Sequence, residues 1–454
     1  MLKARRKTLA VIGAGPKGIA VAVKAKVLEE FGLSVSRVVL IEKDGVAAHW
    51  SGDFGYTNGE MKLGTSPEKD VVFPLETDVG NKVLNERIRQ RLLQFTWTSF
   101  LAQTDRYSDW IDRGRPAPSH HVWALYLKWI SEQLAPQATV IRAEVTKIDL
   151  SGDGKSWSLE LREASNNSTV RVLEADSLML TGPGKTRLEF SGKCGAGLPS
   201  GVYDLESFWK AMKSKTFSRH GRLAIVGAGE NAASALLALS QYASELRADV
   251  ISPKGFVSTR AEGFYENQVY SRPETNGWKE LDRSDRKEFI ERTDLGVFSV
   301  HAMSLLNEQA RHKIIAGRVK ALEVLADGIS LKIDYHQRVS DRVYDQVILA
   351  TGFDQLATLK GFLSERALCL LKKAVGPDLS QMDLTDRIQS DLSVEGVTPK
   401  LHLPMLAGLA QGPGFSNLSC LGLLSDRVVI SSLLESSKRN PRQKFQPILA
   451  EVSQ

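Results

Sequence analysis

Two short glycine-rich sequences contain the residues of this chain whose types and spacing most clearly suit a ligand. They read GAGPKG at residues 13–18 and GAGENA at residues 227–232. In such a pattern the first glycine permits a tight turn, and the second lets a pyrophosphate approach the backbone. The third small residue brings a helix close to a strand, and the N–H groups that begin this helix face the phosphates. We assign these glycines to two dinucleotide sites: Gly13, Gly15 and Gly18 to the first, and Gly227 and Gly229 to the second.

The charged residues that follow each turn predict which dinucleotide it binds. Residues 37–41 read as a strand that ends in Glu42, an acid placed to hydrogen-bond a ribose hydroxyl. After the strand at 249–252 no acid follows, and Lys254 and Arg260 favour a 2′-phosphate, hence NADPH over NADH. A solvated loop charge is the alternative for Lys254. The N-terminal copy is expected to hold FAD, with Glu42 and Lys43, and the internal copy NADPH, with Glu230, Asn231, Lys254 and Arg260.

The segments around both turns have the order strand, turn, helix. We predict a strand at 8–12 and a helix at 19–30 in the first unit, and a strand at 222–226 and a helix at 233–246 in the second. Short strands are expected between 140 and 185 and again between 318 and 353. A last helix is expected at 425–437.

Composition limits the class of protein. A length of 454 residues, with 42% hydrophobic and 25% charged residues, predicts a globular protein of two or three domains. The net charge of +6 is modest, and the lysines and arginines are scattered along the chain. Both features argue against nucleic-acid binding. Because we find neither a signal peptide nor an apolar run of about 20 residues, we expect a cytoplasmic protein with no membrane partner.

Two nucleotides in one chain imply hydride transfer, so the final electron acceptor must be identified. The three cysteines, Cys194, Cys369 and Cys420, form no CxxC pair, which disfavours a disulfide reductase. The chain has no HExxH or GxSxG motif and no cluster of metal ligands, and the adjacent His120 and His121 read as loop or cap residues. Oxygen is then the natural acceptor. We predict no metal and no catalytic side chain, because a flavin can carry this chemistry.

Several longer motifs resemble a known family over nearly the whole chain. The chain is similar to the flavin-dependent N-hydroxylating monooxygenases of siderophore biosynthesis, and within them most resembles the mycobactin-type lysine N-hydroxylases. The FxGxxxH motif of the Baeyer–Villiger and amine-oxygenating flavoproteins is missing. The resemblance rests on VIGAGPKG (11–18), HW (49–50), GYTNG (55–59), LGTSPEKD (63–70), WIDRGRPAP (110–118), FYENQVY (264–270) and ATGF (350–353).

This resemblance implies a reaction and its substrates. NADPH would reduce FAD, O2 would form a C4a-hydroperoxyflavin, and one oxygen would pass to the side-chain amine of L-lysine to give N6-hydroxylysine. L-ornithine or a diamine such as cadaverine or putrescine remains an alternative substrate. From a different class, the chain could be a catalytically inactive nucleotide-binding redox sensor.

The resemblance also implies four substrate-binding residues. Lys69 would pair with the substrate carboxylate, and Asn267 would orient the substrate near the nicotinamide. Asp294 stands where the ornithine enzymes have asparagine, so it either contacts the α-amino group or caps a turn. Asn417, in GFSNLS (414–419) where relatives have a Gly-Leu-Ser-Asp pattern, is assigned to the flavin or substrate site. A surface ion pair for Lys69 and a turn role for Asn267 are the structural alternatives.

Other residues are expected around the flavin ring. Trp50, Met61 and Leu63 can line it without titrating, and His49 can hydrogen-bond to it, although core packing explains these residues as well. Gly352, in the ATGF motif, is also expected to contact the cofactor.

The fold class expected is α/β, with two Rossmann-like dinucleotide-binding domains. The FAD domain would be discontinuous, comprising residues 1–205 and 340–454. The NADPH domain would be inserted at 206–339 and would include a small substrate-contacting segment at 260–300. The resemblance further implies a homo-oligomer, a tetramer in the family.

Overall fold

The computed structural model describes residues 6–54, 56–135, 138–163, 170–188, 197–243, 246–309 and 312–439; Cys194 lies outside them. The first unit is built on a sheet of five parallel strands in the order β20-β7-β1-β2-β3. The residues at the centre of β1 are buried on both faces, as in a parallel sheet covered by helices on either side. The strands are β1 (Thr8–Ile12), β2 (Arg37–Ile41), β3 (Ala138–Ile141), β7 (Ser177–Leu180) and β20 (Lys400–His402).

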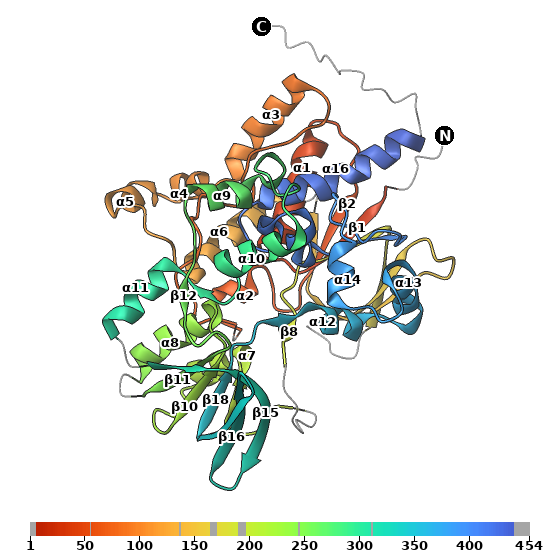
Figure 1. Cartoon of the computed structure of the whole chain (residues 1–454). Coiled ribbons are helices and arrows are strands. Elements are labelled where there is room, and N and C mark those ends of the chain that lie inside the picture. The colour runs from red at the N-terminus through yellow and green to blue at the C-terminus, as the bar shows by residue number, and fades with distance from the viewer. Residues whose placement is uncertain are drawn as a thin grey trace.

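Helix α1 (Pro16–Glu30) lies in the centre of the first unit. It is buried from Pro16 to Leu28 and packs against α16 (Leu421–Arg439), so helices from the two ends of the chain complete one domain (Figure 1). The remaining helices here are α2 (Ala48–Ser51), α3 (Lys82–Leu92), η1 (Leu93–Phe95), α4 (Trp97–Gln103), α5 (Tyr107–Asp112), α6 (His120–Gln133), α12 (Gln355–Phe362), α13 (Glu365–Val375), α14 (Gln381–Asp386), η3 (Pro404–Leu406), α15 (Gly408–Gln411) and η4 (Pro413–Phe415).

The second unit repeats this plan. Its five parallel strands have the order β14-β11-β10-β18-β9. The strands are β9 (Val202–Asp204), β10 (Leu223–Val226), β11 (Ala248–Ser252), β14 (His312–Ala316) and β18 (Gln346–Leu349), and the helices are α7 (Leu205–Lys213), α8 (Glu230–Tyr242) and α11 (Val300–Gln309).

Each unit also carries a three-stranded antiparallel sheet, inserted before the last strands of its parallel sheet. In the first unit it consists of β4 (Ala143–Leu150), β5 (Trp157–Glu163) and β6 (Val170–Ala175); in the second, of β15 (Arg318–Leu325), β16 (Gly328–Tyr335) and β17 (Arg338–Tyr344). The chain is therefore two doubly wound units of the same architecture, as the paired glycine-rich turns predicted.

Two chain crossings join the units. Strand β8 (Lys185–Thr186) leaves the first unit and pairs antiparallel with β19 (Phe353–Asp354), which returns to it. The N–H of Arg187 donates to the carbonyl of Gly352 at 2.9 Å, and its guanidinium donates to the carbonyl of Phe353 at 3.1 Å. The inserted unit is thus connected through one narrow, hydrogen-bonded ribbon.

A segment of the second unit leaves its own domain and packs against the first. It begins and ends at the paired strands β12 (Ser258–Thr259) and β13 (Val297–Phe298), and contains α9 (Phe264–Ser271), η2 (Pro273–Thr275) and α10 (Arg283–Thr293). Figure 1 shows α9 and α10 among the helices of the first unit. Trp278 fixes the contact, because its side chain is fully buried and donates to the carbonyl of Leu409 at 3.2 Å.

Element bounds agree closely with expectation at β1, β2, β10 and β11, whereas α1 begins at Pro16, three residues before the expected start. Helix α8 ends at Tyr242, short of the expected residue 246, and α16 begins four residues before the expected 425. Strands β9 and β18 belong to the second sheet but lie outside the range 206–339 expected for that unit. Over the residues that the structure describes, we find no helix with the length and apolar content needed to cross a bilayer.

Candidate active site

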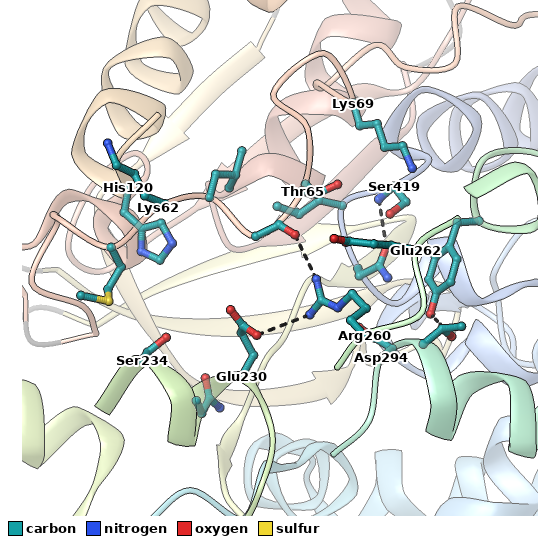
Figure 2. Close-up of a pocket in the computed structure, with 18 of the residues that line it drawn as sticks. Lys62, Thr65, Lys69, His120, Glu230, Ser234, Arg260, Glu262, Asp294 and Ser419 are labelled. Atoms are coloured by element: carbon teal, nitrogen blue, oxygen red, sulfur yellow. Dashed lines mark hydrogen bonds and ion pairs between the residues drawn. The ribbon is translucent and has the colours of Figure 1, made fainter. Parts of the chain in front are cut away.

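A cavity of about 280 Å³ lies where the two units meet. Its walls come from the loop between α2 and α3, from the start of α8, from the excursion between β12 and β13, and from the segment before α16 (Figure 2). Most of the side chains predicted for the site contribute to this lining: His49, Trp50, Met61, Leu63, Lys69, Glu230, Asn231, Arg260, Asn267, Asp294 and Asn417. Residues as far apart in sequence as 49 and 417 therefore converge on one site.

Lys69 and Asn267 are in direct contact, although 198 positions separate them in the sequence. The Lys69 ammonium donates to the side-chain oxygen of Asn267 at 2.5 Å. The amide nitrogen of Asn267 in turn donates to the backbone carbonyl of Glu262 at 2.8 Å. Burial lowers the pKa of Lys69. The contact fixes a cationic group at one end of the cavity, which suits a carboxylate ligand.

The loop that carries Lys69 is fixed by the buried carboxylate of Asp70. One oxygen accepts the N–H of Val72 at 3.1 Å, and the other accepts the N–H of Trp97 at 2.8 Å. Burial raises the pKa of Asp70 to about 7. Because this carboxylate satisfies backbone donors of the loop and of α4, it holds the neighbouring residue, Lys69, in a defined position.

Asp294 lies on the floor of the cavity at the C-terminal end of α10. Burial raises the pKa of its carboxyl group, while nearby Arg260, a hydrogen bond with Asn417 and Lys17 favour the ionised form. Asn417 also accepts the N–H of Ser419 at 2.9 Å. Asp294 is thus both a helix-ending residue and a cavity residue.

An aromatic wall lies opposite Lys69. The rings of Trp50 and His120 are 4.8 Å apart and nearly perpendicular, and Met61 and Leu63 are buried beside them. Burial lowers the pKa of both His49 and His120 to about 4, so both rings are neutral at neutral pH. Such a wall can receive a large planar ring without placing a charge against it.

The N-terminus of α1 fits the phosphates of a dinucleotide. Gly15 caps the helix without a side-chain hydrogen bond, and a Cβ added at Gly15 would meet no atom within 4 Å. A Cβ at Gly18 would instead clash with the carbonyl of Gly13, so Gly18 is needed for packing and Gly15 leaves the approach open. Glu42 follows β2, and its carboxylate accepts the N–H of Ala14 at 3.1 Å, directly beside this turn.

The N-terminus of α8 has the same construction. Gly229 caps it without a side-chain bond, and a Cβ there would find its nearest neighbour at 3.7 Å, an ordinary contact. Glu230, in the first turn of this helix, accepts the N–H of Ser299 at 2.6 Å. The second turn is therefore also open to a phosphate group.

Nine predicted cofactor residues do not line the main cavity: five belong to the two turns described above (Gly13, Gly15, Gly18, Glu42 and Gly229), and the other four are Lys43, Gly227, Lys254 and Gly352. Lys254 is exposed and pairs with Glu291 at 3.6 Å, and it does not come together with Arg260, which lies in the cavity and donates to the carbonyl of Gly64 at 3.0 Å. Lys43 lines a separate charged cavity of about 450 Å³ beside α7. Gly227 forms the turn before α8, and Gly352 lies in the crossover ribbon.

Sequence reasoning missed several residues of the cavity, among them His120 and Glu262. His120 was read as a loop or cap residue; it does begin α6, but its ring also lines the cavity and its Nδ1 is 3.0 Å from the hydroxyl of Thr57. Glu262 was not singled out, although it lies five residues before Asn267 in the same segment. An acid so close to a predicted substrate residue is the signal that could have identified it.

Comparison with known proteins gives concordant matches. A family model described as L-lysine 6-monooxygenase/L-ornithine 5-monooxygenase matches residues 89–355. The L-lysine N6-monooxygenase MbtG of Mycobacterium sp. (strain MCS) is 40% identical over 449 residues, which cover 97% of this chain and 99% of that protein. MbtG of Mycobacterium tuberculosis is 38% identical over 96% of this chain and 97% of that protein.

A solved structure agrees with these matches. That of the lysine monooxygenase NbtG from Nocardia farcinica is 38% identical, with a TM-score of 0.80 over 93% of this chain and 99% of that one. It is described as having an unprecedented NADPH domain conformation.

Proposed function

Since this chain belongs to the L-lysine 6-monooxygenase/L-ornithine 5-monooxygenase family, we propose that it hydroxylates the side-chain amine of L-lysine, using FAD, NADPH and O2. The product is N6-hydroxylysine, a precursor of siderophores or related hydroxamates. The observation that carries the choice of an amino acid is the contact between Lys69 and Asn267 in the cavity where the units meet. A cation fixed in that place suits a substrate that has a carboxylate.

The residues of both turns fit the two cofactors. FAD would lie against Gly13, Gly15 and Glu42, and NADPH against Gly229 and the start of α8, because both helices begin without a side-chain cap. Once reduced by NADPH, the flavin supplies activated oxygen, which is chemistry that no side chain of the chain provides.

We assign the binding of the substrate head group to the polar side of the cavity. Lys69 binds the carboxylate, and Asn267 orients it while holding the ammonium of Lys69. Asp294 and Asn417 complete the polar floor through their mutual hydrogen bond. The aromatic side, with His49, Trp50, Met61 and Leu63, would line the flavin ring and exclude water from the reacting amine.

The reaction requires an uncharged substrate amine, although a free lysine amine has a pKa of about 10.4. Transfer of this group from water into a partly apolar cavity disfavours its charged form. The cavity wall formed by Trp50, His120 and Met61 carries no charge at neutral pH, so it favours the neutral amine that can attack an oxygen.

Product analysis tests the proposal most directly. The purified protein, loaded with FAD, is incubated with NADPH, oxygen and a panel of amines that contains L-lysine, L-ornithine, cadaverine and putrescine. We expect N6-hydroxylysine as the principal product, with NADPH oxidation stimulated by L-lysine. If no amine is hydroxylated although both nucleotides bind, the proposed activity is wrong and a redox-sensing role gains support.

Lysine and ornithine differ by one methylene, worth about 0.8 kcal/mol of burial, so cavity depth decides between them. Catalytic efficiency measured on both amino acids decides this point. We also propose a cytoplasmic homo-oligomer, a tetramer by resemblance to the family; cell fractionation and light scattering of the purified protein test these two points.

A further inference from the structure

Glu262 is the acid of the cavity whose charge is least compensated. Glu230 accepts the N–H of Ser299 at 2.6 Å and its hydroxyl at 2.9 Å, and Asp294 is hydrogen-bonded to Asn417. Among the residues that the structure describes, no hydrogen bond or ion pair reaches the carboxylate of Glu262. Glu262 lines the cavity from an exposed position, and partial desolvation of its carboxylate raises its pKa. Because none of the described protein groups occupies its oxygens, this carboxylate is available to a cationic group of a ligand that enters the cavity.

The backbone of Glu262 is fixed relative to Lys69. Its carbonyl accepts the amide of Asn267 at 2.8 Å, and Asn267 accepts the Lys69 ammonium at 2.5 Å. One chain of hydrogen bonds therefore joins the cation and the acid through a single asparagine. Figure 2 shows the Glu262 carboxylate between Lys69 on one side and Arg260 on the other.

Lys69 and Glu262 attract each other but form no ion pair. The positive charges of Lys69 and Arg260 act on the Glu262 carboxylate, and Glu230 repels it. The Lys69 ammonium has three N–H donors. One of them bonds to Asn267, and the other two can bond to a ligand. The two opposite charges thus stand apart beside one cavity, an arrangement that complements a zwitterion.

We propose that Glu262 is a specificity-determining residue that binds the α-ammonium group of the amino-acid substrate, while Lys69 binds its carboxylate. This inference rests on the proposed function and refines it. Asp294, to which the α-amino group was assigned as one option from the sequence, already has Asn417, Arg260 and Lys17 around its charge. Glu262 and Lys69 together select a compound that carries both head-group charges, and discriminate against diamines and ω-amino acids that carry only one.

Three ligands test the two head-group charges of the substrate independently. L-Lysine carries both head-group charges, 6-aminohexanoate keeps the carboxylate without the α-ammonium, and cadaverine keeps a second ammonium without the carboxylate. Their affinities are measured by isothermal titration calorimetry on the FAD-loaded protein, beside the KM for L-lysine and for NADPH. The variants are Glu262→Gln and Lys69→Met. Glu68→Gln is the matched control, because its carboxylate lies on the Lys69 loop, is exposed and does not line the cavity.

We expect Glu262→Gln to weaken the binding of L-lysine and of cadaverine by about tenfold or more, the usual scale for a lost charged hydrogen bond, and to leave 6-aminohexanoate nearly unchanged. Lys69→Met should weaken L-lysine and 6-aminohexanoate and spare cadaverine. Glu68→Gln should change no affinity by more than about twofold.

Two results overturn the inference. One is an unchanged affinity and KM for L-lysine in Glu262→Gln; the other is a rise in the KM for NADPH alone, which would assign Glu262 to the nicotinamide nucleotide. Both are distinguishable from failure of the proposed function, because in either case the unsubstituted protein still binds and hydroxylates L-lysine.

Discussion

Lys69 illustrates how much of the site depends on single side chains. Its ammonium is held by Asn267, and its loop is held by Asp70, so its position does not depend on a bound ligand. We predict that Lys69→Met raises the KM for L-lysine by about tenfold or more, with a smaller change in kcat and unchanged FAD content, because a uniform binding contact is lost. Steady-state hydroxylamine formation and the flavin spectrum measure these effects.

A second lysine variant, Lys82→Met, serves as the control for Lys69→Met. Lys82 is exposed at the start of α3 and does not line the cavity, so Lys82→Met should behave like the unsubstituted protein. Equal KM values for L-lysine in Lys69→Met and in the unsubstituted protein would remove the role assigned to Lys69.

His120 gives a prediction about stability and pH. Burial lowers its pKa from 6.5 to about 4, so the unfolded chain binds more protons than the folded one between these pH values. The contribution of neutral His120 to the free energy of unfolding is complete above pH 6.5. It is lost as the pH falls to about 4, which lowers the free energy of unfolding by up to about 3 kcal/mol. We predict that the free energy of unfolding falls less steeply over this window in His120→Gln, measured by urea denaturation.

Two other buried groups affect the same experiment. His49 shifts in the same direction and adds to the loss at low pH. Asp70 acts oppositely, because its raised pKa gives stability that is lost as the pH rises through about 7. The comparison of His120→Gln with the unsubstituted protein cancels the contribution of Asp70 but not all of that of His49, because the charge of His49 also lowers the pKa of His120. His220→Gln, at an exposed position, is the control. Parallel pH profiles for all three proteins would contradict the assigned burial effect.

The residues that could be predicted were those whose motif carries its own chemistry. Lys69 and Asn267 could be singled out because each lies in a distinctive motif, and the structure brings the two side chains into contact in the cavity. Glu262 and His120 were missed, because an acid in a loop and a histidine at a helix start have many ordinary roles. Whether such side chains face a cavity depends on how α6 and the excursion between β12 and β13 pack, which local sequence does not encode.

At the scale of elements, two glycines at the start of α1 have different roles: Gly15 leaves room for a ligand, and Gly18 allows the helix to pack. Gly15→Ala places a methyl group in open space at a residue with φ of −85°, so the fold should persist. FAD affinity should fall by tenfold or more, because that methyl group occupies the path of the pyrophosphate. Gly18→Ala should instead destabilise the whole first unit through the clash with the carbonyl of Gly13. FAD titration and circular dichroism of both variants measure the two effects.

A different outcome would change the assignment of that turn. If Gly15→Ala bound FAD as tightly as the unsubstituted protein, the N-terminus of α1 would not be the phosphate site. Loss of helical signal in Gly15→Ala would mean that the methyl group is not accommodated, contrary to the free space beside Gly15.

The elements that were predicted correctly are those with a local signal. Strands β1 and β2 are short apolar runs, and α1 follows a glycine turn, so periodicity and turn chemistry were sufficient. Helices α3 to α6 and α12 to α14 were not predicted. Several of them are short and rely on the rest of the first unit for their buried face, and α5 buries only Trp110.

At the scale of the whole molecule, the two units have separate hydrophobic cores. The core of the first unit draws on residues between 9 and 179 and between 356 and 429. The two clusters that flank the second sheet draw on residues between 202 and 350, with Met61 as the exception from the first unit. We therefore propose domain bounds close to β9 and β18, wider than the range 206–339. Two glycine-rich turns in the sequence were enough to predict two units, but the sequence could not show which sheet a strand near a crossover joins.

Separate cores predict separate responses to the two nucleotides. A ligand that binds only the folded state stabilises it by about 2.7 kcal/mol at a hundredfold excess over its Kd. Although the β8–β19 ribbon, the β12–β13 excursion and the bonds of Lys213 to the carbonyls of Gly52 and Asp53 connect the units, each unit has its own core, so we predict two calorimetric unfolding transitions. FAD should raise the Tm of one and NADP+ that of the other. Gly15→Ala should abolish only the FAD shift and Gly229→Ala only the NADP+ shift, because each methyl group obstructs one phosphate site and meets no neighbour closer than 3.7 Å. A single transition whose Tm both nucleotides raise equally, in every variant, would contradict this prediction. It would mean that the two units unfold together as one cooperative unit.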